Sequence, residues 1–208
     1  MSTLNNILKH KIVAIIRGAN PEDVLKISDA LFAGGVRILE ITMNSLEPLQ
    51  VIEQLANKLG DKMIIGAGTV IDVPMAKDAI AAGAKFILSP VVDIDIIKFA
   101  KNSGVVVIPG AYTPTEILYA FKNGGDIIKV FPAVSPGYLK DIAGPLPQIP
   151  LLPTGGINLE NIKKYQQAGA VGFGIGSSLV NVKKEITGRY LNEITVAAGK
   201  LVREIADF

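Results

Sequence analysis

The chain has 208 residues, of which 49% are hydrophobic and 19% are charged, so it can build the core of one globular domain, predicted to span residues 1–208. A net charge of +2 without a long basic run argues against nucleic acid or an acidic membrane as the main partner. The chain has no cysteine, which excludes disulfides, zinc–thiolate sites and iron–sulfur clusters, and no apolar run of the ~18 residues that cross a membrane. We therefore expect a cytoplasmic protein.

Short apolar runs recur about every 19 to 25 residues, the length of one strand followed by one helix. The segments between them have helical composition, and one opens with Asn20-Pro21-Glu22-Asp23, a capping residue followed by proline and two acids. The expected strands, in chain order, are Ile12–Ile16, Arg37–Thr42, Met63–Ala67, Phe86–Ser89, Val105–Ile108, Ile127–Val130, Pro150–Pro153 and Val171–Gly174. Eight such units predict an α/β fold of the (β/α)8 TIM barrel type, with a doubly wound open sheet as the alternative.

Lys129 lies in an apolar strand that ends before Pro132, where its ammonium group would be poorly hydrated. Desolvation lowers the pKa of a lysine, and a neutral amine is a nucleophile toward carbonyl groups. Alternation along the strands turns both Glu40 and Lys129 toward the mouth of the barrel, where the active sites of such barrels lie. The two residues are candidate catalytic groups, although a solvated edge lysine or a structural ion pair would show the same pattern.

Glycine-rich turns follow the last two expected strands, as Gly155-Gly156 and Gly176-Ser177. Glycine lets backbone N–H groups approach an anion, and barrel enzymes often bind phosphate at these two positions. Plain tight turns would have the same composition. We interpret these residues as a candidate phosphate site.

The turn Gly66-Ala67-Gly68-Thr69 lacks the third glycine of a dinucleotide-binding fingerprint. We interpret its glycines as letting a substrate lie close to the backbone, with the Thr69 hydroxyl as a donor. Asp72, Asp93 and Asp95 lack the spacing of metal ligands and are interpreted as acids at helix starts. No metal and no cofactor is expected.

Six motifs occur in unbroken order between Ile12 and Val180: Glu40-Ile-Thr, Gly66-Ala-Gly-Thr-Val, Ser89-Pro90, Ile108-Pro-Gly, Lys129-Val-Phe-Pro-Ala and Pro153-Thr-Gly-Gly-Ile. Together they resemble the 2-keto-3-deoxy-6-phosphogluconate (KDPG) aldolases, a family that includes the 4-hydroxy-2-oxoglutarate (KHG) aldolases. The resemblance implies a (β/α)8 barrel, a homotrimer and a metal-free class I aldolase. It places the Schiff-base lysine on Lys129 and the catalytic glutamate on Glu40.

The partners implied by the resemblance are pyruvate and a phosphorylated keto acid. In this family threonine and proline contact the keto acid, an aromatic side chain lines the pocket, and the glycine turns hold the phosphate. The matching substrate-binding residues are Arg17, Thr69, Pro90, Phe131, Thr154, Gly155, Gly156, Gly176 and Ser177.

One position departs from the pattern of many phosphogluconate enzymes, which carry an arginine four residues after the glutamate. Here the position is Asn44, and Asn44-Ser45 is more similar to the 2-keto-3-deoxy-6-phosphogalactonate (KDPGal) aldolases, which differ in C4 stereochemistry. The expected reaction is cleavage of KDPG to pyruvate and glyceraldehyde 3-phosphate. KDPGal and 4-hydroxy-2-oxoglutarate are the alternative substrates.

Two other classes of protein also fit a phosphate-binding barrel. A sugar-phosphate isomerase or epimerase would commonly use histidine, paired carboxylates or a metal, and His10 is the only histidine of this chain. A non-catalytic sugar-phosphate sensor would have no need of Lys129. The lysine therefore favours the aldolase.

Overall fold

The computed structural model describes residues 2–206; Met1, Asp207 and Phe208, at the ends of the predicted domain, lie outside the described residues. The strands are β1 (Ile12–Ile16), β2 (Ile38–Thr42), β3 (Ile64–Gly68), β4 (Phe86–Leu88), β5 (Val106–Ile108), β6 (Gly110–Ala111), β7 (Ile128–Val130), β8 (Leu151–Pro153) and β9 (Phe173–Ile175). The helices are α1 (Thr3–His10), α2 (Pro21–Ala33), α3 (Pro48–Leu59), α4 (Val73–Ala81), α5 (Ile94–Asn102), α6 (Pro114–Lys122), α7 (Pro136–Ala143), α8 (Ile162–Gln167) and α9 (Gly188–Ala206). Within residues 2–206, no helix combines the length and the apolar character needed to cross a membrane.

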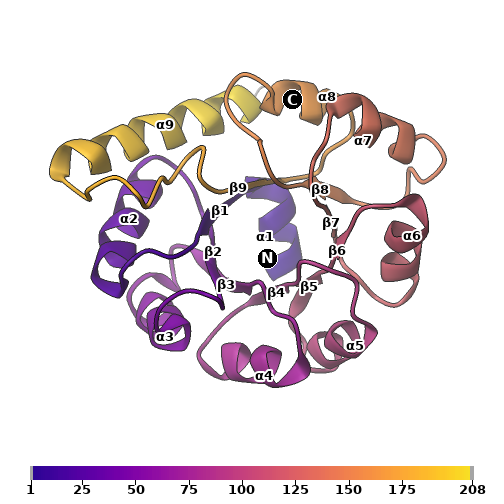
Figure 1. Cartoon of the computed structure of the whole chain (residues 1–208), viewed down its shortest axis with the longest axis horizontal. Helices are drawn as coiled ribbons and strands as arrows, with labels where there is room; N and C mark the ends of the chain where they lie inside the picture. Colours follow the sequence, from indigo (N-terminus) through magenta and orange to yellow (C-terminus); the bar gives the residue numbers. More distant parts are fainter. Residues whose placement is uncertain (1, 207–208) are drawn as a thin grey trace.

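The strands form two parallel sheets, in the orders β5-β4-β3-β2-β1-β9 and β6-β7-β8. They curl around a common centre, and α2 to α9 surround them (Figure 1). The predicted strands all occur, with bounds that agree to within two residues, and the fifth continues into β6. The expected closed barrel is interrupted at two places. One lies between β5 and β6 at Pro109, which has no N–H to donate to a neighbouring strand, and the other lies between β8 and β9, whose segments share only isolated bridges.

The two faces of the curled sheets bury different cores, as the alternation of side chains predicts. Leu39 and Ile41 of β2 pack outward in the core shared with the helices, whereas Ile38 belongs to a separate inner cluster. Ile7 of α1 lies in the same inner cluster, and Figure 1 shows α1 across the centre of the ring of strands. The inner cluster therefore fills the amino ends of β1 and β2 and also includes the last residues of β4 and β5, which leaves the carboxyl ends of the other strands for a site.

Local sequence signals account for several helix starts. Thr113 and Glu116 form a capping box at α6, in which the Thr113 hydroxyl accepts from the Glu116 N–H at 3.3 Å and the Glu116 carboxylate accepts from the Thr113 N–H at 2.8 Å. Asp72 and Asp93 accept backbone N–H groups at the starts of α4 and α5, which confirms their interpretation as helix-start acids. Asn20 precedes α2 as expected, but its side chain makes no capping hydrogen bond.

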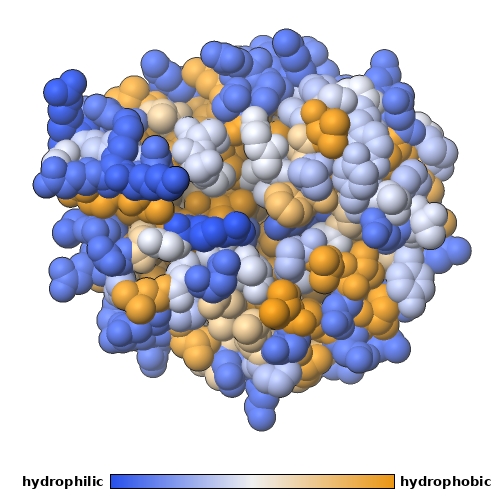
Figure 2. All heavy atoms as spheres, in the orientation of Figure 1, coloured by the Kyte–Doolittle hydropathy of each residue, from blue (hydrophilic) through white to orange (hydrophobic). Residues whose placement is uncertain are grey.

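Large apolar side chains are exposed on several loops that follow strands. Leu46, Ile71, Val91 and Val134 have exposed fractions between 54% and 60%. Ile71 and Val91 lead into α4 and α5, and Figure 2 shows hydrophobic surface over that part of the molecule. Apolar surface of this kind is common at contacts between proteins.

Candidate active site

Among residues 2–206, Glu40 of β2 and Lys129 of β7 are the two charged residues that are buried, with exposed fractions of 1% and 4%. Two residues earlier in the chain, Ile38 of β2 and Ile127, which directly precedes β7, belong to the inner apolar cluster. Because side chains alternate along a strand, this places Glu40 and Lys129 on the inner face as well. The structure thus confirms the inward direction that the sequence predicts for both residues.

Burial shifts both groups toward their neutral forms. Desolvation lowers the pKa of Lys129, an effect that the Glu40 carboxylate opposes and the Arg17 guanidinium strengthens. Desolvation likewise raises the pKa of Glu40, against the attraction of Lys129 and Arg17. A lysine with a lowered pKa has a larger fraction of neutral, nucleophilic amine at pH 7.

The ion pairs between described residues all lie elsewhere, so no carboxylate–ammonium contact within 4.0 Å joins Glu40 to Lys129. Oε2 of Glu40 is buried and has no hydrogen-bond partner among residues 2–206. A buried oxygen without a partner is costly to keep, and such atoms are found where a substrate completes the hydrogen bonding. This oxygen can therefore form a hydrogen bond with a bound molecule.

The glycines of β3 make space for neighbouring side chains. A Cβ placed on Gly68 would lie 2.6 Å from Cγ of Glu40 and closer still to its carboxyl group. A Cβ on Gly66 would lie 2.5 Å from Cζ of Phe86. The interpretation that these glycines admit a substrate is therefore wrong, because protein side chains occupy the space beside them.

A cavity of about 310 Å³ opens at the carboxyl ends of β1, β7, β8 and β9. Seven predicted substrate-binding residues line it: Arg17, Phe131, Thr154, Gly155, Gly156, Gly176 and Ser177. The other residues in its lining are Ile15, Ser178, Val180, Asn181, Val182 and Lys183. The structure therefore brings the two glycine turns together, as the phosphate interpretation requires.

The turn after β8 needs its glycines. Gly155 and Gly156 have φ values of +98° and +73°, a conformation that side-chain-bearing residues rarely adopt. The Gly156 carbonyl accepts from the side-chain amides of Asn158 at 3.3 Å and Asn161 at 2.9 Å, which fixes the loop. At the base of the same turn, Oγ1 of Thr154 is buried without a partner among the described residues.

Two residues of the cavity lining lie close to other predicted site residues: Phe131 lies beside Lys129, and Arg17 lies beside Thr69. The amine of Lys129 lies 4.7 Å from the centre of the Phe131 ring, and Phe131 is 39% exposed. Nη2 of Arg17 lies 3.4 Å from the Thr69 hydroxyl, and the Arg17 charge acts on both Glu40 and Lys129. Arg17 thus lines the cavity and also acts on the buried pair, Glu40 and Lys129.

Pro90 lies after β4, away from the glycine turns that follow β8 and β9. It follows β4 and packs beside β6, where a Cβ on Gly110 would lie 2.5 Å from its carbonyl carbon. Neither Pro90 nor Thr69 lines the cavity of the glycine turns. The two residues are on the side of the rim where β3 and β4 end.

Ser45, in the dipeptide that departs from the phosphogluconate pattern, touches the Arg17 turn. Its hydroxyl accepts from the Gly18 N–H at 2.9 Å and lies 2.9 Å from the Thr42 hydroxyl. The loop after β2 is thereby held against the loop after β1.

Asn181 and Lys183 also line the cavity, and no sequence motif predicted this, because both lie in an irregular loop between β9 and α9. The available signal was their closeness in sequence to Ser177. His10 ends α1, just before the start of β1, so it lies at the opposite end of that strand from Arg17. Among residues 2–206, no group of three or more His, Cys, Asp or Glu side chains is arranged to hold a metal ion.

The family model described as KDPG and KHG aldolase matches residues 4–196. The chain belongs to this family. The 2-dehydro-3-deoxy-6-phosphogalactonate aldolase of Escherichia coli K12 is 35% identical over 182 residues, covering 86% of this chain and 88% of that protein. The 2-dehydro-3-deoxy-phosphogluconate aldolase of Pseudomonas aeruginosa PAO1 is 37% identical over 158 residues, covering 74% and 71%.

A solved structure of a KDPG/KHG family member extends the likeness to the fold. The KDPG aldolase of Legionella pneumophila, with pyruvate captured at low pH as a covalent carbinolamine intermediate, matches with a TM-score of 0.84 at 30% identity. The match covers 96% of this chain and 98% of that one. The resemblance inferred from the motifs is confirmed, and with it the prediction that this chain is an aldolase, a lyase.

Proposed function

We propose that this KDPG/KHG aldolase cleaves a 2-keto-3-deoxy sugar acid 6-phosphate, with KDPG as the substrate, to pyruvate and glyceraldehyde 3-phosphate. The observation that carries the proposal is the Lys129 amine, 4% exposed, with a pKa lowered by burial, on the same inner surface as Glu40. A protein that only bound sugar phosphates would gain nothing from a buried, partly neutral amine.

The reaction begins with attack of the neutral Lys129 amine on the C2 ketone. The resulting carbinolamine loses water to give an iminium ion, which serves as an electron sink. Glu40 accepts the proton of the C4 hydroxyl, the C3–C4 bond breaks, and glyceraldehyde 3-phosphate leaves. The enamine that stays on Lys129 is protonated at C3, and water then hydrolyses the iminium to release pyruvate and the free amine.

The substrate lies across the rim with its two anionic ends held apart. The keto acid contacts Arg17, Thr69 and Pro90, and Arg17 pairs with the carboxylate. The phosphoryl group lies in the cavity of about 310 Å³, on the backbone of Gly155 and Gly156 and on Ser177. Holding both ends fixes C2 against the amine, which removes much of the entropic cost of the reaction.

KDPGal is the second candidate substrate, and the loop after β2 favours it. Asn44-Ser45 replaces the arginine of many phosphogluconate enzymes, and Ser45 contacts the turn that carries Arg17. Relatives named as phosphogalactonate and as phosphogluconate aldolases match this chain at similar identity, 35% and 37%, so the loop after β2 carries this alternative. 4-Hydroxy-2-oxoglutarate is the unphosphorylated alternative.

The proposal includes a closed (β/α)8 barrel and a homotrimer. Pro109 alone separates β5 from β6, and bridges at Leu151–Ala170 and Thr154–Gly174 link the β8 segment to the β9 segment, which supports closure. The exposed apolar side chains on the loops after β2, β3, β4 and β7 support an assembly. The trimer and the cytoplasmic location stay predictions.

Trapping with pyruvate tests the proposal. Incubation of the protein with pyruvate and borohydride should add a stable mass to the peptide that contains Lys129, and Lys129→Met should abolish the adduct. An adduct that persists in this variant, or no adduct on the unaltered protein, would overturn the assignment. Pyruvate release from KDPG and KDPGal, measured side by side, then decides the epimer.

A further inference from the structure

We propose that Lys183 binds the phosphoryl group of the substrate and sets the preference for phosphorylated over unphosphorylated sugar acids. The inference rests on the proposed function and deepens it. Lys183 lines the cavity of about 310 Å³ next to Ser177, in the loop that joins β9 to α9. The sequence motifs of the family do not include it.

The charges in the cavity favour an anion. Arg17 and Lys183 are the charged side chains in its lining, and no carboxylate is among the lining residues. Arg17 is placed at the reacting end, because its charge acts on Glu40 and Lys129 and its guanidinium contacts Thr69. Lys183 is then the cation available to the far end of the substrate, where the phosphoryl group lies.

The backbone that carries Lys183 is held in place. Tyr190 of α9 is buried, and its hydroxyl accepts from the Asn181 N–H at 2.7 Å and donates to the Asn181 carbonyl at 3.2 Å. The Asn181 side chain in turn accepts from the Lys183 N–H at 3.1 Å. A fixed backbone reduces the ordering that binding requires, although the side chain itself is exposed.

The next residue, Lys184, has a different environment. Its ammonium lies 3.6 Å from the Glu193 carboxylate and 4.9 Å from the centre of the Tyr190 ring, and it does not line the cavity. Among the described residues, Lys183 has no carboxylate within 4.0 Å of its ammonium. The two neighbouring lysines therefore form a matched pair for a test of position against charge.

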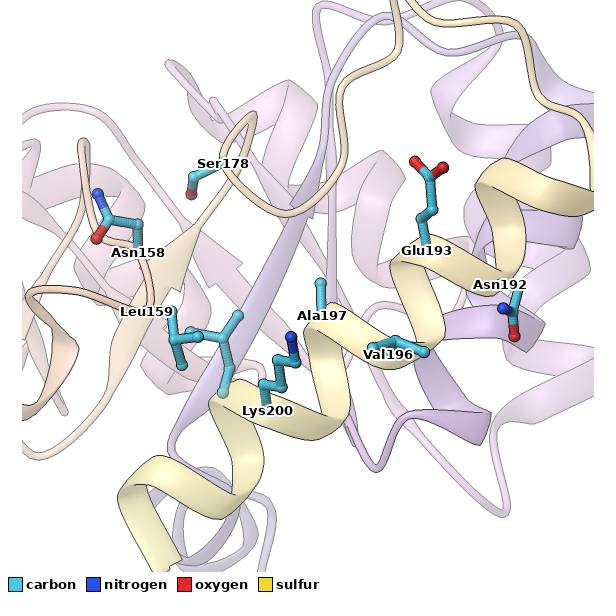
Figure 3. Close-up of a pocket in the computed structure, with 9 residues that line it drawn as sticks. Asn158, Leu159, Ser178, Asn192, Glu193, Val196, Ala197 and Lys200 are labelled. Carbon is cyan, nitrogen blue, oxygen red and sulfur yellow. The ribbon is translucent and has the colours of Figure 1, made fainter.

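An adjacent groove does not compete for the anion. It has a volume of about 390 Å³ and lies between α9 and the loops after β8 and β9. Figure 3 shows Glu193, Val196 and Lys200 along α9, with Asn158 and Ser178 on the opposite side. Because this groove contains one charge of each sign and apolar side chains, it lacks the positive potential of the cavity beside Lys183.

The test compares Lys183→Met with Lys184→Met, two variants that lose the same charge one residue apart. For KDPG, Lys183→Met should lose about tenfold or more in kcat/KM, mainly through KM, as expected for one charge-assisted hydrogen bond at a partly solvated site. For the unphosphorylated 2-keto-3-deoxygluconate its kcat/KM should be unchanged. Lys184→Met should match the unaltered protein on both substrates, and Lys183→Arg should restore most of the loss.

Binding of glycerol 3-phosphate, measured by calorimetry, gives a readout that does not require turnover. Its affinity should fall about tenfold in Lys183→Met and stay unchanged in Lys184→Met. Equal losses in both variants, or a loss in Lys183→Met that is the same with and without phosphate on the substrate, would overturn the role of Lys183. Pyruvate trapping on Lys129 separates the two proposals: an adduct with no Lys183 effect contradicts this inference alone, and no adduct contradicts the proposed reaction.

Discussion

The substitution Gly68→Ala tests the position of Glu40 without altering any titratable group. Gly68 pairs with Thr42 of β2, and its φ is outside the left-handed region, so the backbone itself accommodates alanine. The added Cβ would lie 2.6 Å from Cγ of Glu40 and closer to its carboxyl group, where nonbonded carbon atoms normally stay about 3.5–4.0 Å apart. Glu40 is 1% exposed, so it can yield only by displacing its neighbours.

Two effects of this substitution follow from the structure. Overpacking of a buried site typically costs about 1–3 kcal/mol of folding free energy, which should appear as a lower unfolding temperature. Displacement of a general base from hydrogen-bonding distance typically lowers kcat about 10²–10⁴-fold, and we expect a loss of about 100-fold or more per folded molecule. The Lys129 adduct with pyruvate should still accumulate on long incubation, because its amine is not displaced.

Gly66→Ala is the matched control, because its Cβ would lie 2.5 Å from Cζ of Phe86 in the inner core and not beside the Glu40 carboxyl group. It should be destabilised to a similar degree while keeping kcat per folded molecule. In the double variant Gly68→Ala/Glu40→Ala, removal of the carboxyl group should restore most of the lost stability, a coupling expected for residues in direct contact. Wild-type kcat in Gly68→Ala, or a loss of stability that Glu40→Ala does not relieve, would refute the reasoning.

Two further predictions concern the ionisation of Lys129 and the buried hydroxyl of Thr154, which has no hydrogen-bond partner among residues 2–206. The fraction of Lys129 trapped with pyruvate and cyanoborohydride should reach half its maximum at a pH below 10.5, because burial lowers the pKa of the amine. Glu40→Gln should move this midpoint to lower pH, and Arg17→Met should move it to higher pH. A shift in the same direction in both variants would contradict the effects assigned to the two charges. Thr154→Val should keep or raise the unfolding temperature, because the buried Oγ1 loses no described partner, while KM for KDPG rises. A lower unfolding temperature measured by calorimetry would show that the hydroxyl has a structural partner.

The inward direction of Glu40 and Lys129 could be predicted from local patterns, because strand alternation is a short-range property. Ile38 and Ile127 on the inner face fixed the direction of Glu40 and Lys129, and glycines at positive φ marked the turn after β8. These features depend on a few neighbouring residues, which the sequence displays directly. The same holds for the acids at the starts of α4 and α5.

The features that the sequence did not reveal depend on contacts between distant segments. Gly68 looked like space for a substrate, but the side chain beside it comes from Glu40 on the neighbouring strand. Lys183 lies in a loop without regular structure, and its place follows from Tyr190 binding to Asn181. No periodicity carries such information, because packing between elements decides it.

The chemistry of Lys129 depends on a helix that contains no catalytic residue. Ile7 of α1 belongs to the inner cluster with Ile38 and Ile127, so α1 covers the amino ends of the strands beneath Glu40 and Lys129. Desolvation is the largest cause of the pKa shifts of both groups, and it requires that water reach them only from the rim. Together with the rest of the inner apolar cluster, α1 therefore adds to the burial that lowers the pKa of the Lys129 amine.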